Sequence, residues 1–174
     1  MATWTTRGLA AAGPTLIAIA TVTGCADGPA KPAADDGRRP TAVGADVGTL
    51  DGVAFDVRRD PGCGCCTSWT EYLTKHGAAV ELSEDPERQA FRTQQGVPEG
   101  ASSCHTAVVD GYTIEGHVPI PAIQRLLDER PDAIGLALPG MPADSPGMGG
   151  DSTSWANQPV MLIDAQGALV PFDY

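Results

Sequence analysis

Apolar and polar positions follow a regular pattern from residue 53 onward. Residues 53–57 alternate between apolar and polar side chains, which is typical of a strand, and the Asp-Pro-Gly sequence at 60–62 predicts a turn. Between residues 69 and 73 apolar side chains recur at helical spacing, and Gly77 is typical of a helix end. The pattern therefore predicts a strand, a turn and a helix in that order.

The same reasoning extends the order of elements to the end of the chain. Residues 78–82 predict a second strand, and Asp85 followed by Pro86 suits the N-cap and first turn of a helix that ends at Gly96. Asp-Gly at 110–111 is typical of a two-residue hairpin loop. The other predicted elements are strands at 106–109 and 112–115, a helix at 121–129, a Gly-, Pro- and Met-rich loop at 138–159, and a terminal hairpin of 160–163 with 168–172. The predicted fold class is α/β, in the order β-α-β-α-β-β-α, with an added loop and C-terminal β-hairpin.

The first 48 residues predict export followed by a tether. Arg7 precedes an apolar stretch at 9–22 that is short for a membrane span and rich in small residues. The small residues directly before Cys25 resemble a bacterial lipobox, whose cysteine is acylated and becomes the N-terminus; the alternative is an ordinary cleaved signal in which Cys25 is incidental. We expect a lipoprotein signal peptide at 1–24, a lipidated Cys25 with a flexible linker over 25–48, and a folded domain at 49–174. Such a protein is anchored at the cell envelope, in the periplasm or on the outer surface.

Composition narrows the classes of function. The chain has 174 residues, 42% of them hydrophobic, which is enough for one domain with a buried core and argues against a disordered protein. Eleven Lys and Arg against 22 Asp and Glu give a formal charge of −11. This charge argues against a nucleic-acid partner and weakly favours the recruitment of cations, although a solvated acidic surface is the better explanation.

Four of the five cysteines fall in the predicted folded domain, together with histidines. Three cysteines cluster within residues 63–66, and a fourth, at 104, is followed by histidines at 105 and 117. Thiolate and imidazole are ligands of soft or borderline metals such as Cu(I) and Zn(II), and this set is larger than a redox pair requires. We therefore expect a metal-binding protein rather than an enzyme. The expected metal ligands are Cys63, Cys65, Cys66, Cys104 and His117, with His105, Met141 and Met148 as secondary candidates.

The hairpin loop determines which residues face one another. With the loop at 110–111, Cys104 pairs with His117 across the two strands. Directly opposed residues hold their side chains on one face with Cβ atoms ~5 Å apart, which suits two ligands of one metal. His105 should then point to the opposite face of the sheet. His76 falls at the end of the first helix, where a cation suits the helix dipole, and we place it outside the site.

The order of elements, with Cys63 and Cys66 as a Cys-x-x-Cys pair at the first strand-to-helix junction, resembles the thioredoxin or glutaredoxin fold. In that fold the third strand runs antiparallel to the first, which would bring Cys104 and His117 to the cysteine cluster. The related enzymes usually have a cis-proline just before the third strand, where this chain has a Cys or His. That difference favours a metal site over a dithiol enzyme.

Two other interpretations remain open. A Cys-x-x-Cys pair also suits a membrane-tethered thiol–disulfide oxidoreductase, because a lowered thiol pKa at a helix N-terminus serves metal binding and disulfide exchange alike. Alternatively, the four cysteines form two structural disulfides of a non-catalytic module. Cys65 and Cys66 are adjacent, however, so a second good bridge would need an awkward local partner.

Four linked motifs occur in order along the predicted folded domain: DPGCGCC at 60–66, SCHTAV at 103–108, GYTIEGHVP at 111–119 and GLALPGMP at 135–142. Together they resemble the CopG family of small periplasmic copper-resistance proteins, long classed as a domain of unknown function, and the resemblance covers 53–174. It implies a thioredoxin-like fold whose cysteines bind copper as Cu(I), in one or several thiolate-bridged ions, and it suggests a redox role toward copper. Copper ions and other envelope copper-resistance proteins are the implied partners. Ligand chemistry alone suits Zn(II) or Ag(I) as well.

Overall fold

The computed structural model describes residues 48–174 of the chain. The predicted signal peptide, Cys25 and the linker up to residue 47 lie outside the described residues. The elements in chain order are β1 (Ala54–Arg59), α1 (Gly64–Lys75), β2 (Ala79–Glu84), α2 (Arg88–Gln94), the 3-10 turn η1 (Glu99–Ala101), β3 (His105–Val109), β4 (Tyr112–Glu115), α3 (Ile120–Glu129), β5 (Ala133–Ala137), α4 (Ser152–Trp155), β6 (Met161–Asp164) and β7 (Leu169–Pro171). Every helix within residues 48–174 is too short or too polar to cross a membrane.

The strands of the described residues form one mixed sheet in the order β2-β1-β3-β4-β5-β6-β7. β1 runs parallel to β2 and antiparallel to β3, and β4 runs antiparallel to β3 and parallel to β5. The terminal hairpin adds β6 and β7 as antiparallel strands beyond β5. The predicted α/β class is confirmed.

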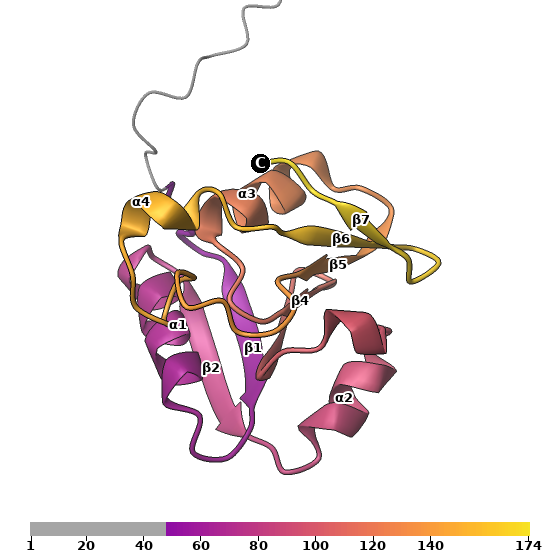
Figure 1. Cartoon of the computed structure of the whole chain (residues 1–174), viewed down its shortest axis with the longest axis horizontal. Helices are drawn as coiled ribbons and strands as arrows, with labels where there is room; N and C mark the ends of the chain where they lie inside the picture. Colours follow the sequence, from indigo (N-terminus) through magenta and orange to yellow (C-terminus); the bar gives the residue numbers. More distant parts are fainter. Residues whose placement is uncertain (1–47) are drawn as a thin grey trace, which may run out of the picture. The chain divides into compact units, whose positions relative to one another are not determined.

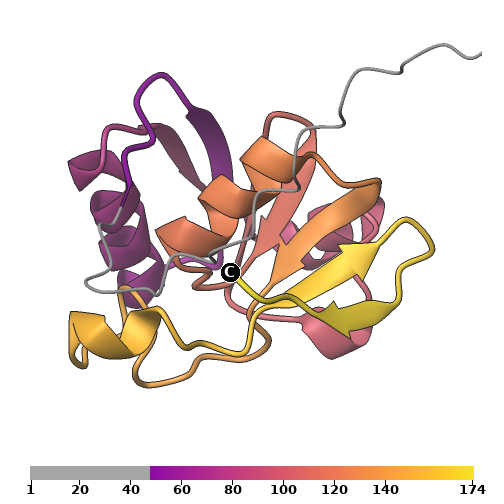
Figure 2. The same ribbon diagram turned by 90° about the horizontal axis from the view of Figure 1, so that it is seen from above.

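Helices cover both faces of this sheet (Figures 1 and 2). On one face, apolar side chains of α1 and α3 meet those of β1, β3 and β4 in the main core. Trp69 is fully buried there, and its indole N–H donates to the Val118 carbonyl at 3.0 Å. On the other face, Arg58 of β1 stacks over Phe91 of α2, with 3.9 Å between the guanidinium carbon and the ring centroid. The face toward α1 is therefore apolar, whereas the face toward α2 carries charge.

The β3–β4 hairpin has the register that the sequence predicts. The loop residues 110–111 adopt φ values of 46° and 86°, as a tight two-residue loop requires, and the strands pair directly on either side of it. Beyond β4, the Gly116 N–H donates to the His105 carbonyl at 3.0 Å. This contact continues the pairing toward Cys104 and His117.

Strand β5 was not predicted from the sequence. It is short and contains Gly135, which weakens a strand pattern. The glycine is required because the backbone of Thr113 in β4 occupies the space that a Cβ would need. Close approach of two neighbouring strands therefore explains both the residue and the missed prediction.

Two helices also differ from the expected pattern. α2 begins at Arg88 rather than directly after Asp85, because the Asp85 carboxylate accepts the Glu87 N–H at 2.8 Å in a turn that precedes the helix. The loop predicted at 138–159 contains the short helix α4, whose N-cap Asp151 accepts the Thr153 N–H at 3.0 Å.

Candidate metal centre

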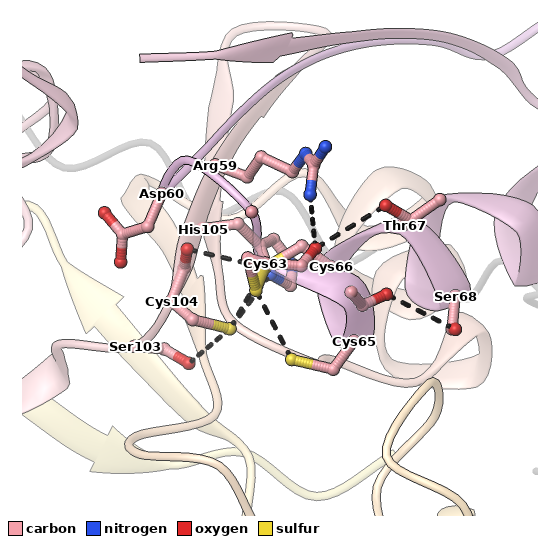
Figure 3. Close-up of a disulfide and its surroundings, with 12 residues drawn as sticks. Arg59, Asp60, Cys63, Cys65, Cys66, Thr67, Ser68, Ser103, Cys104 and His105 are labelled. Carbon is pink, nitrogen blue, oxygen red and sulfur yellow. Dashed lines mark hydrogen bonds between the residues drawn. A yellow bond between two sulfur atoms is a disulfide. The ribbon is translucent and has the colours of Figure 1, made fainter. Parts of the chain in front are cut away.

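The candidate site lies where β1 ends, α1 begins and β3 starts (Figure 3). Cys63 is the N-cap of α1, and Cys65 and Cys66 lie in its first turn. The Cys63 N–H donates to the Asp60 carbonyl at 3.2 Å, and the Asp60 N–H donates to the Cys104 carbonyl at 3.3 Å. Backbone hydrogen bonds through Asp60 therefore tie the two cysteine-bearing segments together.

Four cysteine sulfurs meet at this point. Cys63 and Cys66 form a disulfide, and Cys65 and Cys104 are free thiols that point toward it from different segments (Figure 3). Cys65 Sγ lies 3.4 Å from Cys63 Sγ, and Cys104 Sγ lies 3.3 Å from Cys66 Sγ. All four Sγ atoms lie within 4.8 Å of one another. A single local disulfide differs from the pair of structural bridges considered as an alternative, and it leaves two thiols available.

His117 presents a nitrogen lone pair to this cluster. Its Nε2 lies 3.2 Å from Cys104 Sγ, and its Nδ1 lies 2.7 Å from the Pro146 carbonyl oxygen. Because a carbonyl oxygen only accepts, Nδ1 carries the proton and Nε2 is the nitrogen without one. Burial lowers the pKa of His117, which favours the neutral ring. An imidazole that binds a metal needs this protonation state and this kind of backbone partner.

Cys104 keeps its proton in this state. Burial, and to a smaller extent the nearby Cys65, raises the pKa of the Cys104 thiol to about 12. The Cys104 S–H can therefore donate to His117 Nε2. A soft metal ion that binds Cys104 must displace this proton, so binding releases it.

Two solved structures are similar to this chain, and both are of copper resistance protein CopG, in form 1 and form 2. They superpose with TM-scores of 0.61 and 0.62 at 38% and 39% sequence identity, over 70% of this chain and 98% of theirs. The chain belongs to the CopG family. Residues 101–148, which include Cys104 and His117, match the family described as "Protein of unknown function, DUF411". No protein with a curated description matches the chain.

His105 of this CopG-family protein lies on the same side as the site, so its predicted orientation was wrong. Its Nδ1 is 3.6 Å from Cys104 Sγ, and its ring centroid is 4.9 Å from that of His117. Strand alternation does not reach Cys104, which precedes β3, or His117, which follows the turn at Gly116 with φ 76°.

His105 is as fully buried as His117. Its ring is fully buried against Trp69, with 4.4 Å between centroids, and its Nε2 has no hydrogen-bond partner among the described residues. Burial lowers the pKa of His105 well below its usual range, so the ring is neutral. It is a neutral nitrogen donor in contact with the cluster.

Met141 and Met148 are the remaining candidate ligands. Met141 and Met148 belong to the loop after β5, where Met141 is 56% exposed and Met148 is half-buried. The same loop supplies Pro146, the partner of His117, so it covers that side of the site. Ligation by either methionine stays a prediction. His76 is the C-cap of α1, at the opposite end of the helix from the cysteines, as predicted.

Sequence reasoning missed one buried charge beside the CopG-family site. Arg88 of α2 is 3% exposed, and its guanidinium donates to the Asp60 carboxylate and to the Ser103 carbonyl. Arginine is mostly exposed in proteins, so an arginine at the start of a predicted helix gives no sequence signal of burial. Its partners Asp60 and Ser103 lie within three residues of Cys63 and Cys104, and only the fold brings them to Arg88.

Proposed function

We propose that this protein binds Cu(I) at the bacterial cell envelope and takes part in copper resistance. The proposed ligands are Cys63, Cys65, Cys66, Cys104 and His117, with His105, Met141 and Met148 as secondary candidates. The observation that carries the proposal is the meeting of four cysteine sulfurs within 4.8 Å, beside the unprotonated Nε2 of His117. Membership in a family whose solved structures are of a copper resistance protein supports copper as the metal.

Reduction of the disulfide is the first step of this function. Two electrons and two protons, supplied by a thiol reductant that is itself oxidised to a disulfide, convert the Cys63–Cys66 bridge into two thiols. Cu(I) then displaces the protons of the thiols that it binds. Thiolates select Cu(I), and four of them within 4.8 Å can bridge more than one ion.

The two histidines would complete the coordination with neutral nitrogen. His117 Nε2 faces Cys104 Sγ at 3.2 Å, and the Pro146 carbonyl fixes its tautomer. No hydrogen bond fixes the tautomer of His105 in this way, because its Nε2 has no partner among residues 48–174. Imidazole suits Zn(II) and Cu(II) as well as Cu(I), so the histidines allow a redox role toward copper without requiring one.

Metal competition tests the proposed function. The reduced protein is titrated anaerobically with Cu(I), Ag(I) and Zn(II), each against a chelator of known affinity. We expect tight binding of Cu(I) that exceeds the affinity for Zn(II), because thiolate is a soft ligand. A preference for Zn(II), or equal Cu(I) binding by wild type and by a variant in which all four cysteines are Ser, would reject the proposal.

A second candidate function is thiol–disulfide exchange, favoured by the position of the disulfide. The strand order β2-β1-β3-β4, with a Cys-x-x-Cys disulfide at the start of α1, supports a thioredoxin-like core. If exchange were the main activity, Cys63→Ser would abolish reductase turnover and Cys104→Ser would leave most of it. We expect weak turnover of the metal-free protein; robust turnover that is insensitive to Cys104→Ser would favour the oxidoreductase.

The proposed location rests on the N-terminal sequence. We propose that residues 1–24 are removed and that acylated Cys25 anchors the protein to the membrane. Intact-mass analysis of membrane-extracted protein should find lipid on Cys25 at the mature N-terminus. An unmodified Cys25 thiol in a soluble envelope extract would contradict the anchor.

A further inference from the structure

One buried arginine joins the backbones of the two cysteine segments. Arg88 Nε donates to Asp60 Oδ1 at 2.8 Å, and its Nη2 donates to Asp60 Oδ2 at 3.2 Å and to the Ser103 carbonyl at 3.0 Å. Asp60 shortly precedes Cys63, and Ser103 directly precedes Cys104. The fork of the guanidinium thus holds both segments at once through charge-assisted hydrogen bonds.

Glu115, at the end of β4, extends this set of contacts to the third segment of the site. It is fully buried, its Oε1 accepts the Ser103 N–H at 2.8 Å, and its Oε2 accepts the Thr106 hydroxyl at 2.6 Å. Arg88 Nη1 lies 3.5 Å from the same Oε1. The N–H and the carbonyl of Ser103 are therefore both bound by charged side chains, the N–H by Glu115 and the carbonyl by Arg88. Because Glu115 shortly precedes His117, its one carboxylate links the segments that carry Cys104 and His117.

The backbone of Asp60 also connects the two cysteine segments. Its N–H donates to the Cys104 carbonyl at 3.3 Å, and its carbonyl accepts the Cys63 N–H at 3.2 Å. Cys63 and Cys104 are thus connected in two ways, through the Asp60 backbone and through the Asp60 carboxylate with Arg88. A shift of either segment would break at least one charge-assisted hydrogen bond of the buried Arg88 guanidinium, which is costly.

A second arginine of α2 provides the contrast. Arg92 lies one turn later and is also buried, at 4% exposure, and it pairs with Glu99 of η1 at 2.6 Å. The Glu99 carboxylate is 89% exposed. Arg92 therefore fastens η1 to α2, whereas the hydrogen-bond partners of Arg88 all lie close in sequence to Cys63, Cys104 or His117.

We propose that Arg88 is a positioning residue which, with Asp60 and Glu115, fixes the separation of the Cys63 segment from the Cys104 and His117 segments. This inference rests on the proposed function in one respect, since the fixed separation then sets the affinity of the four-cysteine site for Cu(I). The residue touches no metal itself. It acts through the backbones that carry the ligands.

Matched arginine variants test the effect on copper. Reduced full-length Arg88→Met and Arg92→Met are titrated anaerobically with Cu(I) against a chelator. Outer partners of metal ligands contribute about tenfold to a hundredfold in affinity, so we expect Arg88→Met to lose that much and Arg92→Met to lose less than about twofold. Arg88→Lys keeps the charge without the fork and should recover only part of the loss. Should Arg88→Met fail to fold, Asp60→Asn removes one charge from a half-exposed side chain and should weaken Cu(I) binding by about tenfold.

A metal-free measurement separates this inference from the proposed function. In the Cys25→Ser/Cys65→Ser/Cys66→Ser protein, the remaining cysteines are Cys63 and Cys104, whose Sγ atoms lie within 4.8 Å. In a buffer of reduced and oxidised glutathione they form a bridge, with glutathione disulfide as the oxidant, and the equilibrium constant reports their proximity.

We expect Arg88→Met to lower the equilibrium constant for this bridge severalfold and Arg92→Met to leave it unchanged. Equal behaviour of the two variants in the bridge measurement would overturn the positioning role. If wild type bound no Cu(I) while the bridge still depended on Arg88, the positioning role would stand and the proposed function would fail.

Discussion

Two partly buried clusters meet at one end of the sheet, and they differ in how many of their polar atoms have hydrogen-bond partners. The sulfur–imidazole cluster, toward α1, consists of Cys63, Cys65, Cys66, Cys104, His105 and His117. The guanidinium–carboxylate cluster, toward α2, consists of Asp60, Arg88, Ser103, Thr106 and Glu115. In the first cluster, His105 Nε2 has no partner among the described residues and Cys104 contacts soft or neutral atoms. In the second, both oxygens of each carboxylate accept hydrogen bonds.

This difference suggests that one cluster provides metal ligands and the other stabilises the arrangement of the segments that carry them. Burial favours the neutral forms of Cys104, His105 and His117, so the sulfur–imidazole cluster offers protons and lone pairs that a soft cation can use. The guanidinium–carboxylate cluster holds paired ions whose hydrogen bonds are already made, and such a network stabilises one arrangement. Substitutions in the sulfur–imidazole cluster should therefore mainly lower Cu(I) affinity, whereas substitutions in the guanidinium–carboxylate cluster should also lower the free energy of unfolding.

Removal of Trp69 should have the largest effect, because it removes the packing behind the sulfur–imidazole cluster. Trp69 is fully buried, with ring centroids 4.4 Å from His105 and 6.4 Å from Phe55. Trp69→Ala should lower the free energy of unfolding by about 3–5 kcal/mol. Trp155→Ala removes a half-buried indole of α4 and should cost less. Denaturant unfolding measures both, and equal losses would contradict the central role of Trp69.

Cys104→Ser should give the largest loss of copper binding. It removes a thiolate donor that lies beside both the disulfide and His117, and we expect Cu(I) affinity to fall by at least about a hundredfold, the upper end of what an outer partner contributes. Glu115→Gln, on the other side, should instead lower the free energy of unfolding by about 1–3 kcal/mol, with the smaller effect on copper. Chelator competition and denaturant unfolding on both variants test this. A larger loss of Cu(I) affinity in Glu115→Gln would reverse the assigned roles.

His117→Ala should weaken Cu(I) binding less than Cys104→Ser. Imidazole is a less soft ligand than thiolate, so we expect a loss of about tenfold. His76→Ala is the matched control, because His76 caps the far end of α1 and should leave Cu(I) affinity unchanged. The same anaerobic titration decides the point, and a loss in His76→Ala as large as in His117→Ala would remove His117 from the site.

The smallest expected effect concerns alkaline stability of the core on the α1 side. Burial raises the pKa of Tyr72 from 10.0 to about 12, against a weaker opposing effect of the Ile120 N–H that it accepts. The folded state thus favours the neutral phenol, so this stabilisation is fully present below pH 10 and is lost as pH rises through about 12. Tyr72→Phe should therefore show a weaker fall in free energy of unfolding above pH 10 than wild type. Parallel pH dependence of the two proteins would contradict this pKa shift.

Local pairing rules predicted the part of the site that depends on the β3–β4 hairpin. The Asp-Gly loop at 110–111 sets the register of the hairpin, and beyond it Cys104 and His117 contact each other, with 3.2 Å between Sγ and Nε2. The orientation of His105 could not be derived in this way, because Cys104 and His117 lie just outside the strands. Side-chain alternation applies within a strand and ends with it.

Contacts between segments that are distant in sequence explain the features that could not be predicted from the sequence. Gly135 lies in an unpredicted strand because β4 approaches its backbone, and Arg88 is buried because Asp60, Ser103 and Glu115 converge on it. Neither residue carries a local pattern that distinguishes it from an exposed loop glycine or an exposed helix arginine. The disulfide between Cys63 and Cys66 was likewise undetermined, since four clustered cysteines allow several pairings.

The most direct test of the proposed four-cysteine copper site is whether Cu(I) protects the four thiols from alkylation. Reduced protein, with and without Cu(I), is alkylated anaerobically, and the modified cysteines are identified by mass spectrometry. If Cys63, Cys65, Cys66 and Cys104 share one site, Cu(I) should protect all four, and Cys104→Ser should make the other three reactive again in the presence of Cu(I). Alkylation of the four cysteines at the same rates with and without Cu(I) would contradict the site.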